Sequence, residues 1–168
     1  MVDALACEGG SVTKPQQGDV GLLDDEAARR LLASTEVAHL AYVWSDGSPR
    51  CTPIWFHWNG TEIVMASPAN APKAHAVIDG SPVAVTIDSA AWPYAVLLIR
   101  GRAVVDEVAG VAPEYRLAAV RYFGESQGNG WCDGLPAGIR MTRIRVTPDW
   151  VGVLDFEGMR RLPSALAG

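Results

Sequence analysis

Residues 45–77 read SDGSPRCTPIWFHWNGTEIVMASPANAPKAHAV, a run in which two glycine turns separate strand-forming segments. The dipeptides Asp46-Gly47 and Asn59-Gly60 are typical of two-residue β-hairpins of type I′, whose central residues both need a positive φ. We therefore expect strands at 37–45, 49–58 and 61–67, joined by these two turns.

Three polar residues of this run could hold a phosphate. Arg50 lies in the strand between the turns, Ser67 ends the next strand, and Lys73 follows Pro72, which opens a short helix at 72–79. Charge-assisted hydrogen bonds from such groups anchor phosphates. Each residue also has an ordinary interpretation: Arg50 as a strand arginine paired across the hairpin, Ser67 as a strand-ending hydroxyl, and Lys73 as a solvated lysine.

The flanking sequence predicts a single domain. Asp24 or Asp25 is expected to cap a first helix whose apolar face includes Leu31 and Leu32. The later segments predict strands at 82–88, 96–105, 138–147 and 149–155, a helix at 112–123 and a loop at 124–136. Gly101 is expected to mark a bulge or a sharp bend. We expect residues 1–20 to be a disordered leader, 21–160 the folded domain and 161–168 a tail.

The pattern of elements predicts the fold class. Short strands joined mainly by hairpins, with few helices, favour a mainly β, closed or nearly closed antiparallel barrel. A doubly wound parallel sheet is disfavoured because helices do not alternate with strands.

Composition excludes several classes of partner. The 168-residue chain has a formal net charge of −5, which argues against a nucleic-acid-binding surface. No segment reaches the roughly 18 consecutive apolar residues of a membrane span, and the start lacks the pattern of a secretory signal. Cys7, Cys51 and Cys132 are odd in number and far apart, so we expect no disulfide framework and a cytoplasmic location.

Known catalytic motifs are missing from the sequence. His39, His57 and His75 do not have a usual metal-binding spacing. Neither a G-x-S-x-G elbow nor a nucleotide-binding glycine loop occurs. An enzyme with this sequence would therefore take its reactivity from a cofactor.

The chain resembles the pyridoxamine phosphate oxidase-like superfamily, the FMN-binding split barrels, which includes flavin and deazaflavin oxidoreductases. The resemblance covers roughly residues 26–105. It rests on the hairpin DGSPRCTPIWF, the Asn59-Gly60 turn, the strand ending Met65-Ala66-Ser67, the segment Pro72-Lys73-Ala74-His75 and the later strand VLLIRGRAVV.

The resemblance implies where a cofactor binds. In that family each site lies between the two subunits of a homodimer. The match implies that Arg50, Cys51, Thr52, Pro53, Ile54 and Trp55 run along the flavin, partly through backbone groups. It further implies that Arg50 approaches the phosphate, that Ser67 places a hydroxyl on it and that Lys73 completes the cradle. Ala66, next to Ser67, is also implied to bind the cofactor, and the partner is implied to close the site near Trp92–Val96.

Two departures favour the broader oxidoreductase group over the vitamin B6 oxidase. Pro72 stands where that enzyme has an arginine before the lysine, and its R-x-H ending has no match here. We therefore expect an FMN-dependent oxidoreductase that acts on a small conjugated substrate. The deazaflavin coenzyme F420 is the alternative cofactor, disfavoured because its oligoglutamate tail would need a second basic patch. The rival class is a non-catalytic binder of flavin, haem or another tetrapyrrole, with His39, His57 or His75 as haem ligand.

Side-chain direction gives the remaining expectations. Phe56 is predicted to face the core, with Trp55 and Trp58 on the other face, where they either stack on a flavin or pack at a dimer interface. Cys51 is predicted to be a small buried residue. The loop residues Trp92 and Tyr94 either cover a cofactor or contact a partner.

Overall fold

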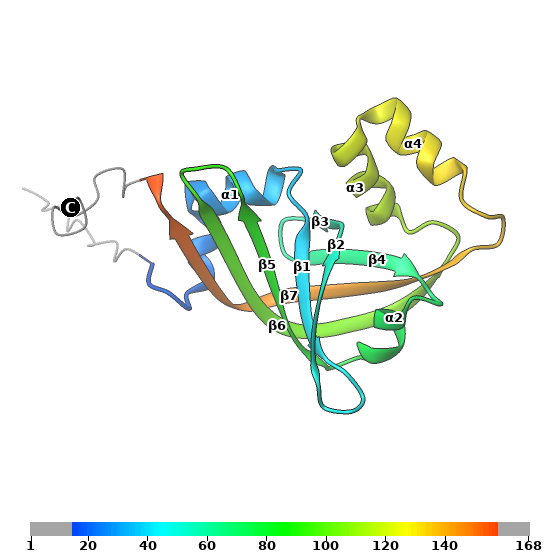
Figure 1. Ribbon diagram of the computed structural model, residues 1–168, viewed down its shortest axis with the longest axis horizontal. Helices are drawn as coiled ribbons and strands as arrows, with labels where there is room; N and C mark the ends of the chain where they lie inside the picture. The colour runs from blue at the N-terminus through cyan, green and yellow to red at the C-terminus, as the bar shows by residue number, and fades with distance from the viewer. Residues whose placement is uncertain (1–14, 158–168) are drawn as a thin grey trace, which may run out of the picture.

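The computed structural model describes residues 15–157, and the elements are arranged as in Figure 1. Residues 1–14 of the predicted leader (1–20) and the whole of the predicted tail (161–168) lie outside the described residues. The helical elements are η1 (Val20–Asp24), α1 (Glu26–Ala33), α2 (Pro72–Ala76), α3 (Pro113–Phe123) and α4 (Glu125–Asp133). The strands are β1 (Ala38–Val43), β2 (Pro49–Ile54), β3 (Phe56–Trp58), β4 (Ile63–Pro68), β5 (Pro82–Ser89), β6 (Ala95–Ala109) and β7 (Arg140–Asp155).

The strands form one antiparallel sheet in the order β2-β1-β5-β6-β7-β4-β3. Its two edge strands, β2 and β3, are neighbours in sequence with only Trp55 between them. Ile54 pairs with Ala38 of β1, whereas Phe56 pairs with Met65 of β4. The chain thus crosses from one edge of the sheet to the other within one residue, which curls the sheet into a barrel. The predicted antiparallel split barrel is confirmed.

Strands β6 and β7 are long and bend together. The pairing register shifts between Arg100 and Gly101, opposite residues 148–150 of β7. A Cβ on Gly101 would lie 2.5 Å from the backbone oxygen of Thr147, so only glycine fits this close approach. The predicted bulge is confirmed. The prediction of two strands at 138–147 and 149–155 is wrong, because pairing with β6 continues past the irregularity in one strand.

The core fills the barrel and is closed at one end by α1. Asp25 caps this helix, accepting a hydrogen bond from the amide of Ala27 at 2.9 Å. Leu31 and Leu32 are buried from α1, and the largest fully buried strand residues include Leu40, Phe56, Ile63, Met65, Ile87, Leu97, Ile99 and Ile144. A smaller cluster, centred on Ala66, Ala112 and Met141, lies where Tyr115 of α3 approaches the sheet.

The predicted loop at 124–136 is wrong, because residues 125–133 form α4. Its sequence, ESQGNGWCD, is rich in poor helix formers. Tertiary packing provides the reason: a Cβ on Gly128 would lie 2.5 Å from the Cα of Val120, so α3 and α4 approach very closely. Helix α2 is also shorter than predicted, because it ends at Ala76.

Both hairpin turns occur where predicted, but neither is of type I′. Positive φ angles occur at Gly47 (82°) and Gly60 (100°), and no other residue type within 15–157 has one. At the first turn, Gly47 donates to the carbonyl of Trp44 at 2.9 Å, which makes a longer loop with glycine in the left-handed position. At the second, Gly60 alone has a positive φ, and the Glu62 amide donates to the side-chain oxygen of Asn59 at 2.7 Å.

None of the helices in the described part of the chain is long and apolar enough to cross a membrane.

Candidate functional site

The split in the barrel contains a cavity of about 330 Å³, which we call the split cavity. Its lining residues come from the position before β1, from β2, the β2–β3 joint, β4, α2 and α3: Val37, Pro53, Ile54, Trp55, Ala66, Ser67, Pro68, Lys73 and Tyr115. Six of the nine predicted cofactor-binding residues are therefore brought to one cavity, although they lie up to 20 positions apart in sequence.

The opening exists because β4 continues beyond its partner. Pairing between β3 and β4 ends at Met65, so residues 66–68 of β4 pair only with β7. On the other side of the split, β2 pairs only with β1. Backbone amides and carbonyls along both margins thus have no strand partner within residues 15–157. Because such groups need hydrogen-bond partners, the margins can bind a polar ligand.

Ser67 contributes a buried hydroxyl to this cavity. The residue is 5% exposed and pairs in register with Thr142 of β7. Its Oγ is buried and has no hydrogen-bond partner within the described chain. Since buried polar atoms are normally hydrogen-bonded, an unpartnered hydroxyl in a cavity wall indicates a missing ligand.

Lys73 contributes a positive charge from α2, which lies below the end of β4 in Figure 1. Pro72 at the first helical position starts this helix. The lysine is half-buried, and its ammonium makes no hydrogen bond or ion pair within residues 15–157. The cation is therefore available to an anionic group.

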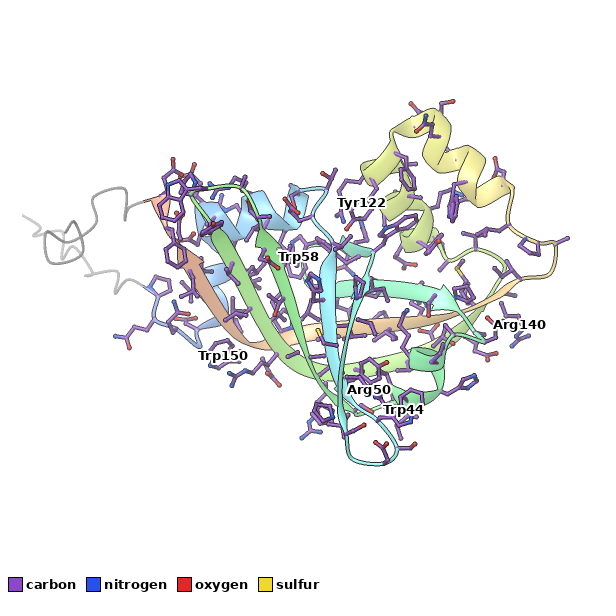
Figure 2. All side chains as sticks on the ribbon, viewed as in Figure 1. Trp44, Arg50, Trp58, Tyr122, Arg140 and Trp150 are labelled. Atoms are coloured by element: carbon purple, nitrogen blue, oxygen red, sulfur yellow. The ribbon has the colours of Figure 1, made fainter. Side chains whose placement is uncertain are left out.

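Arg50 and Thr52 lie in an adjoining cavity of about 310 Å³, together with Tyr42, Trp44 and Pro72. The guanidinium of Arg50 is 5.5 Å from the ring centre of Trp44, near the β1–β2 hairpin (Figure 2). The Oγ1 of Thr52 is a second buried hydroxyl without a partner. Pro72 lines this cavity and Lys73 the split cavity, so the two adjoin at the start of α2. The predicted phosphate ligands are thus divided between neighbouring cavities.

Cys51 is placed differently from its neighbours. It is exposed and lines neither cavity, so the prediction that it is buried is wrong. The reason is alternation along an edge strand: Thr52 and Ile54 face the barrel interior, and Cys51 faces away from it.

Trp55 is the centre of an aromatic cluster. Its ring centre lies 5.3 Å from that of Tyr115, 5.4 Å from Tyr122, 5.1 Å from Phe123 and 6.1 Å from Trp131. All four partners come from α3 and α4, which stand beside the β3–β4 hairpin (Figure 1). The cluster therefore fixes the joint at which the chain changes sheet edge.

The predicted faces of this aromatic segment are partly correct. Phe56 is fully buried in the core, as expected. Trp58 packs against the same core, so the prediction that it shares a face with Trp55 is wrong. Residues two apart share a face of a strand, and Trp58 is two positions from Phe56.

Tyr115 was not predicted as a site residue, although the helical spacing of Tyr115 and Tyr122 was visible in the sequence. Its hydroxyl accepts a hydrogen bond from the indole Nε1 of Trp131 at 3.1 Å. Burial raises the pKa of Tyr115 above its ordinary value of 10.0. The phenol is consequently protonated at neutral pH and keeps its own proton to donate within the cavity.

The three histidines lie elsewhere. His39 is 3.6 Å from a carboxylate oxygen of Asp88, His75 is exposed on α2, and His57 faces the gap between α1 and α3. None lines the split cavity or the adjoining cavity that contains Arg50 and Thr52. No group of potential metal ligands occurs among the residues that the structure describes.

The donor set around the start of α2 fits a phosphate monoester. Two unpartnered hydroxyls, Ser67 and Thr52, face cavities that Lys73 and Arg50 also line. Hydroxyls, an ammonium and a guanidinium are the side chains that bind phosphate oxygens. The planar Trp55 and the backbone margins of the split lie beside them, where a ring could be held.

Comparison with solved structures shows the same fold in other proteins. An F420 reductase is 23% identical, with coverage of 73% of this chain and 93% of that one and a TM-score of 0.53. The conserved hypothetical protein Rv2991 from Mycobacterium tuberculosis is 17% identical, with coverage of 88% and 94% and a TM-score of 0.64. The FAD and heme binding protein from Mycobacterium smegmatis is 20% identical, with coverage of 76% and 69% and a TM-score of 0.53.

Sequence comparison gives the family. No curated protein matches the chain significantly. The family model described as pyridoxamine 5'-phosphate oxidase matches residues 24–155, which include every strand and every helix from α1 to α4. The chain therefore belongs to the pyridoxamine 5'-phosphate oxidase family.

Proposed function

We propose that this protein is a flavin-dependent oxidoreductase that binds FMN in the split of the barrel. The observation that carries the proposal is the buried, unpartnered hydroxyl of Ser67 in the cavity that the free ammonium of Lys73 also lines, with a second such hydroxyl, Thr52 Oγ1, in the adjoining cavity. Buried hydroxyls without partners cost stability unless a ligand satisfies them. A phosphate ester at the start of α2 would satisfy the Ser67 hydroxyl and pair with the lysine, and one that reaches the adjoining cavity would satisfy Thr52 as well.

Each part of the site has a role in this proposal. Lys73, Ser67, Thr52 and Arg50 hold the phosphate, and the backbone of Pro53–Trp55 lies along the ring. The flavin supplies hydride transfer to or from a small conjugated substrate. The Tyr115 hydroxyl donates a hydrogen bond to a substrate oxygen, while Trp131 fixes the orientation of the phenol. The rings around Trp55 form an apolar wall that excludes water.

The working form in this proposal is a homodimer, with the partner subunit closing the site. Trp92, Tyr94 and Phe156 form an aromatic group whose ring centres are 5.1–6.3 Å apart, and Trp92 is 57% exposed. Exposed apolar surface of this kind is typical of interfaces. Light scattering with cofactor present tests this part: we expect a dimer at micromolar concentration, and a monomer would overturn it.

Two alternatives differ in the cofactor or in catalysis. The similarity to a protein named F420 reductase supports a deazaflavin in the same split. The similarity to a FAD and heme binding protein supports a binding module without catalysis. Haem in either cavity near α2 would need a ligand other than His39, His57 or His75, since none of these lines them.

The absorbance spectrum of the purified protein separates these proposals. We expect the visible bands of an oxidised flavin, which bleach on reduction. A single band at shorter wavelength that is lost on reduction would indicate the deazaflavin, and a sharp Soret band would indicate haem. If the protein purifies without a chromophore, titration with FMN, F420 and haemin identifies which one binds. Failure of all three would overturn the proposed function.

A further inference from the structure

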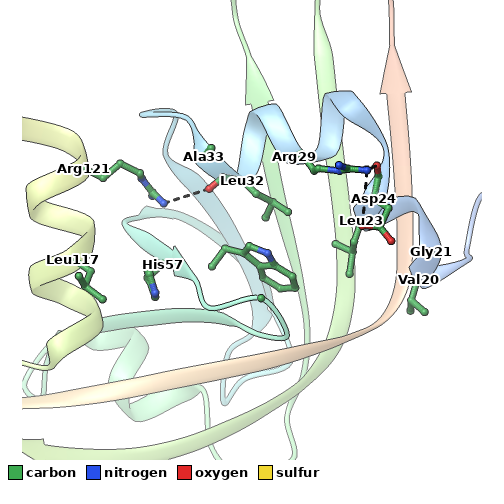
Figure 3. Close-up of a pocket in the computed structure, with 12 residues that line it drawn as sticks. Val20, Gly21, Leu23, Asp24, Arg29, Leu32, Ala33, His57, Leu117 and Arg121 are labelled. Atoms are coloured by element: carbon green, nitrogen blue, oxygen red, sulfur yellow. Dashed lines mark hydrogen bonds and ion pairs between the residues drawn. The ribbon is translucent and has the colours of Figure 1, made fainter.

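A third cavity, larger than the two described above, lies in a groove between α1 and α3 (Figure 3). Its volume is about 840 Å³, within the range that small-molecule ligands occupy. The floor is β3 with the turn at Gly60, and the walls are η1 and α1 on one side and α3 on the other. We call it the α1–α3 groove. None of the nine predicted cofactor-binding residues lines it.

Arg121 bridges this groove from α3. One guanidinium nitrogen donates to the carbonyl of Phe56 at 2.6 Å, and another reaches the carbonyl of Leu32 on α1 at 3.4 Å. Figure 3 shows the second contact crossing between the two helices. The guanidinium carbon also lies 4.2 Å from the ring centre of Phe56. These contacts hold the charge at a fixed position in the groove wall.

The positive charge of Arg121 is not neutralised by the described part of the protein. None of the ion pairs within residues 15–157 includes Arg121. Its Nε is buried and has no hydrogen-bond partner, and the bond to Leu32 is at the long limit for a hydrogen bond. A half-buried charge without a counter-ion is costly, and an anionic ligand would remove that cost.

His57 lies beside Arg121 in the same groove. Burial lowers the pKa of His57, the positive charge of Arg121 lowers it further, and Glu114 acts in the opposite direction. The imidazole is therefore neutral at pH 7. It makes no hydrogen bond within residues 15–157, so it can donate one to a ligand.

The rest of the groove is apolar apart from one self-contained ion pair. Leu23, Leu32, Trp58 and Leu117 line it, and Leu117 is 51% exposed. At the far end, Arg29 donates to the backbone oxygen of Asp24 and lies 4.0 Å from its carboxylate. Since that pair is balanced and His57 is neutral, the groove carries the single net positive charge of Arg121.

We propose that the α1–α3 groove binds an apolar monocarboxylate. The carboxylate lies against Arg121 and His57, and the apolar body lies over Trp58 and Leu117. One uncompensated positive charge matches a monoanion, whereas a phosphate dianion would be only half neutralised. This site is independent of the cofactor site in the split, which faces Lys73 and Ser67 instead.

Calorimetric titration of the purified protein with three eight-carbon probes tests the charge requirement. We expect octanoate to bind at least about tenfold more tightly than octan-1-ol, because a charge-assisted hydrogen bond is lost in the alcohol. Octylammonium should bind more weakly than octan-1-ol. Equal affinity for octanoate and octan-1-ol would overturn the proposal.

Matched variants test the location. Arg121→Gln should reduce octanoate affinity about tenfold or more, while Arg102→Gln, which also removes an arginine bound to a backbone carbonyl, should not. Because Arg121 also ties α3 to α1, Leu117→Glu provides a second variant at an exposed position, with the exposed Leu154→Glu as its control. We expect Leu117→Glu to abolish octanoate binding. Normal binding in Leu117→Glu, or loss of binding in Lys73→Ala alone, would place the ligand elsewhere and overturn the proposal.

Discussion

The indole of Trp131 donates a 3.1 Å hydrogen bond to the hydroxyl of Tyr115, and this contact ties α4 to the wall of the split cavity. Tyr115 lines the cavity, whereas Trp131 does not line it and is 51% exposed. A helix that does not itself line the cavity therefore sets the orientation of a phenol that does.

We expect Tyr115→Phe to slow substrate reduction while leaving cofactor binding unchanged. Removing a hydrogen-bond donor to a substrate oxygen costs about tenfold in rate. Because the pKa of Tyr115 is raised by burial, the loss should be the same throughout the neutral pH range. Single-turnover reduction of a small quinone measures the rate, and Trp131→Phe should give a smaller loss in the same direction. Equal rates in Tyr115→Phe and wild type would remove the phenol from the chemistry.

Lys73→Ala should weaken FMN binding by about tenfold or more, since truncating a charged partner of a phosphate costs about 1.5–3 kcal/mol. The stability of the apo-protein should change little, because alanine is the best helix former. Titration of apo-protein with FMN and with F420 measures both affinities. His75→Ala, on the same helix but outside both cavities, is the control.

Arg50→Ala extends this comparison across the two adjoining cavities. If one phosphate spans both, the losses in Arg50→Ala and Lys73→Ala will be similar and the double variant will be nearly free of cofactor. A normal affinity in Arg50→Ala would restrict the phosphate to the split cavity. Normal affinity in both single variants would contradict the assignment.

Ser67→Ala should have opposite effects on the empty and the loaded protein. The buried hydroxyl has no partner in the described chain, so its removal should leave the unfolding free energy of the apo-protein unchanged or slightly higher. FMN affinity should fall. Urea unfolding of the apo-protein measures the change in stability, and titration with FMN measures the change in affinity. A clear loss of apo-protein stability would mean that Ser67 is satisfied by the fold itself.

Gly101→Ala should destabilise the protein by about 1–3 kcal/mol through overpacking. A Cβ there would lie 2.5 Å from the carbonyl oxygen of Thr147. The matched control is Gly130→Ala in α4, where a Cβ meets nothing within 4 Å and should stabilise the helix by about 0.5–1 kcal/mol. The unfolding free energies of the two variants, measured with urea, should therefore change in opposite directions. Equal changes would contradict the tight approach at Gly101.

The protein should lose stability on acidification through His57. Burial and Arg121 lower its folded-state pKa below 6.5, so the unfolded chain binds the proton more tightly. This contribution is fully present above pH 6.5 and is lost as the pH falls through the lowered value. Unfolding free energies measured between about pH 5 and 8 should show a shallower acid slope in His57→Gln, with His75→Gln as control. An unchanged slope in His57→Gln would contradict this assignment.

The sequence predicted what depends on local signals. The glycine turns at Gly47 and Gly60, the cap at Asp25 and the bulge at Gly101 follow from backbone preferences of single residues, and all occur. The predicted type I′ turns were wrong, because that type needs a positive φ at two residues and only the glycine of each turn has one. Helix α4 was missed because close packing on α3, and not propensity, forms it.

The site was predictable as far as its residues lie close together in the sequence. Ser67 and Lys73 are six positions apart and share a cavity, as expected. Tyr115 and Trp131 reach Trp55 from 60 and 76 positions away, and no local pattern predicts such contacts. The α1–α3 groove was not foreseen for the same reason, because Arg121 and Leu32 are 89 positions apart.

The single-residue crossing between the edges of the sheet also has a consequence for synthesis on the ribosome. The hairpins on either side of Trp55 can form as soon as residue 68 has emerged, but the rings that hold Trp55 belong to residues 115–131. We therefore expect a stage of synthesis in which both hairpins have formed but Trp55, the residue between them, is not yet packed. At this stage the apolar faces of both hairpins are exposed to solvent. Chaperone contact should concentrate on that interval, and it should end when β7, the partner of β4 in the sheet, has left the exit tunnel.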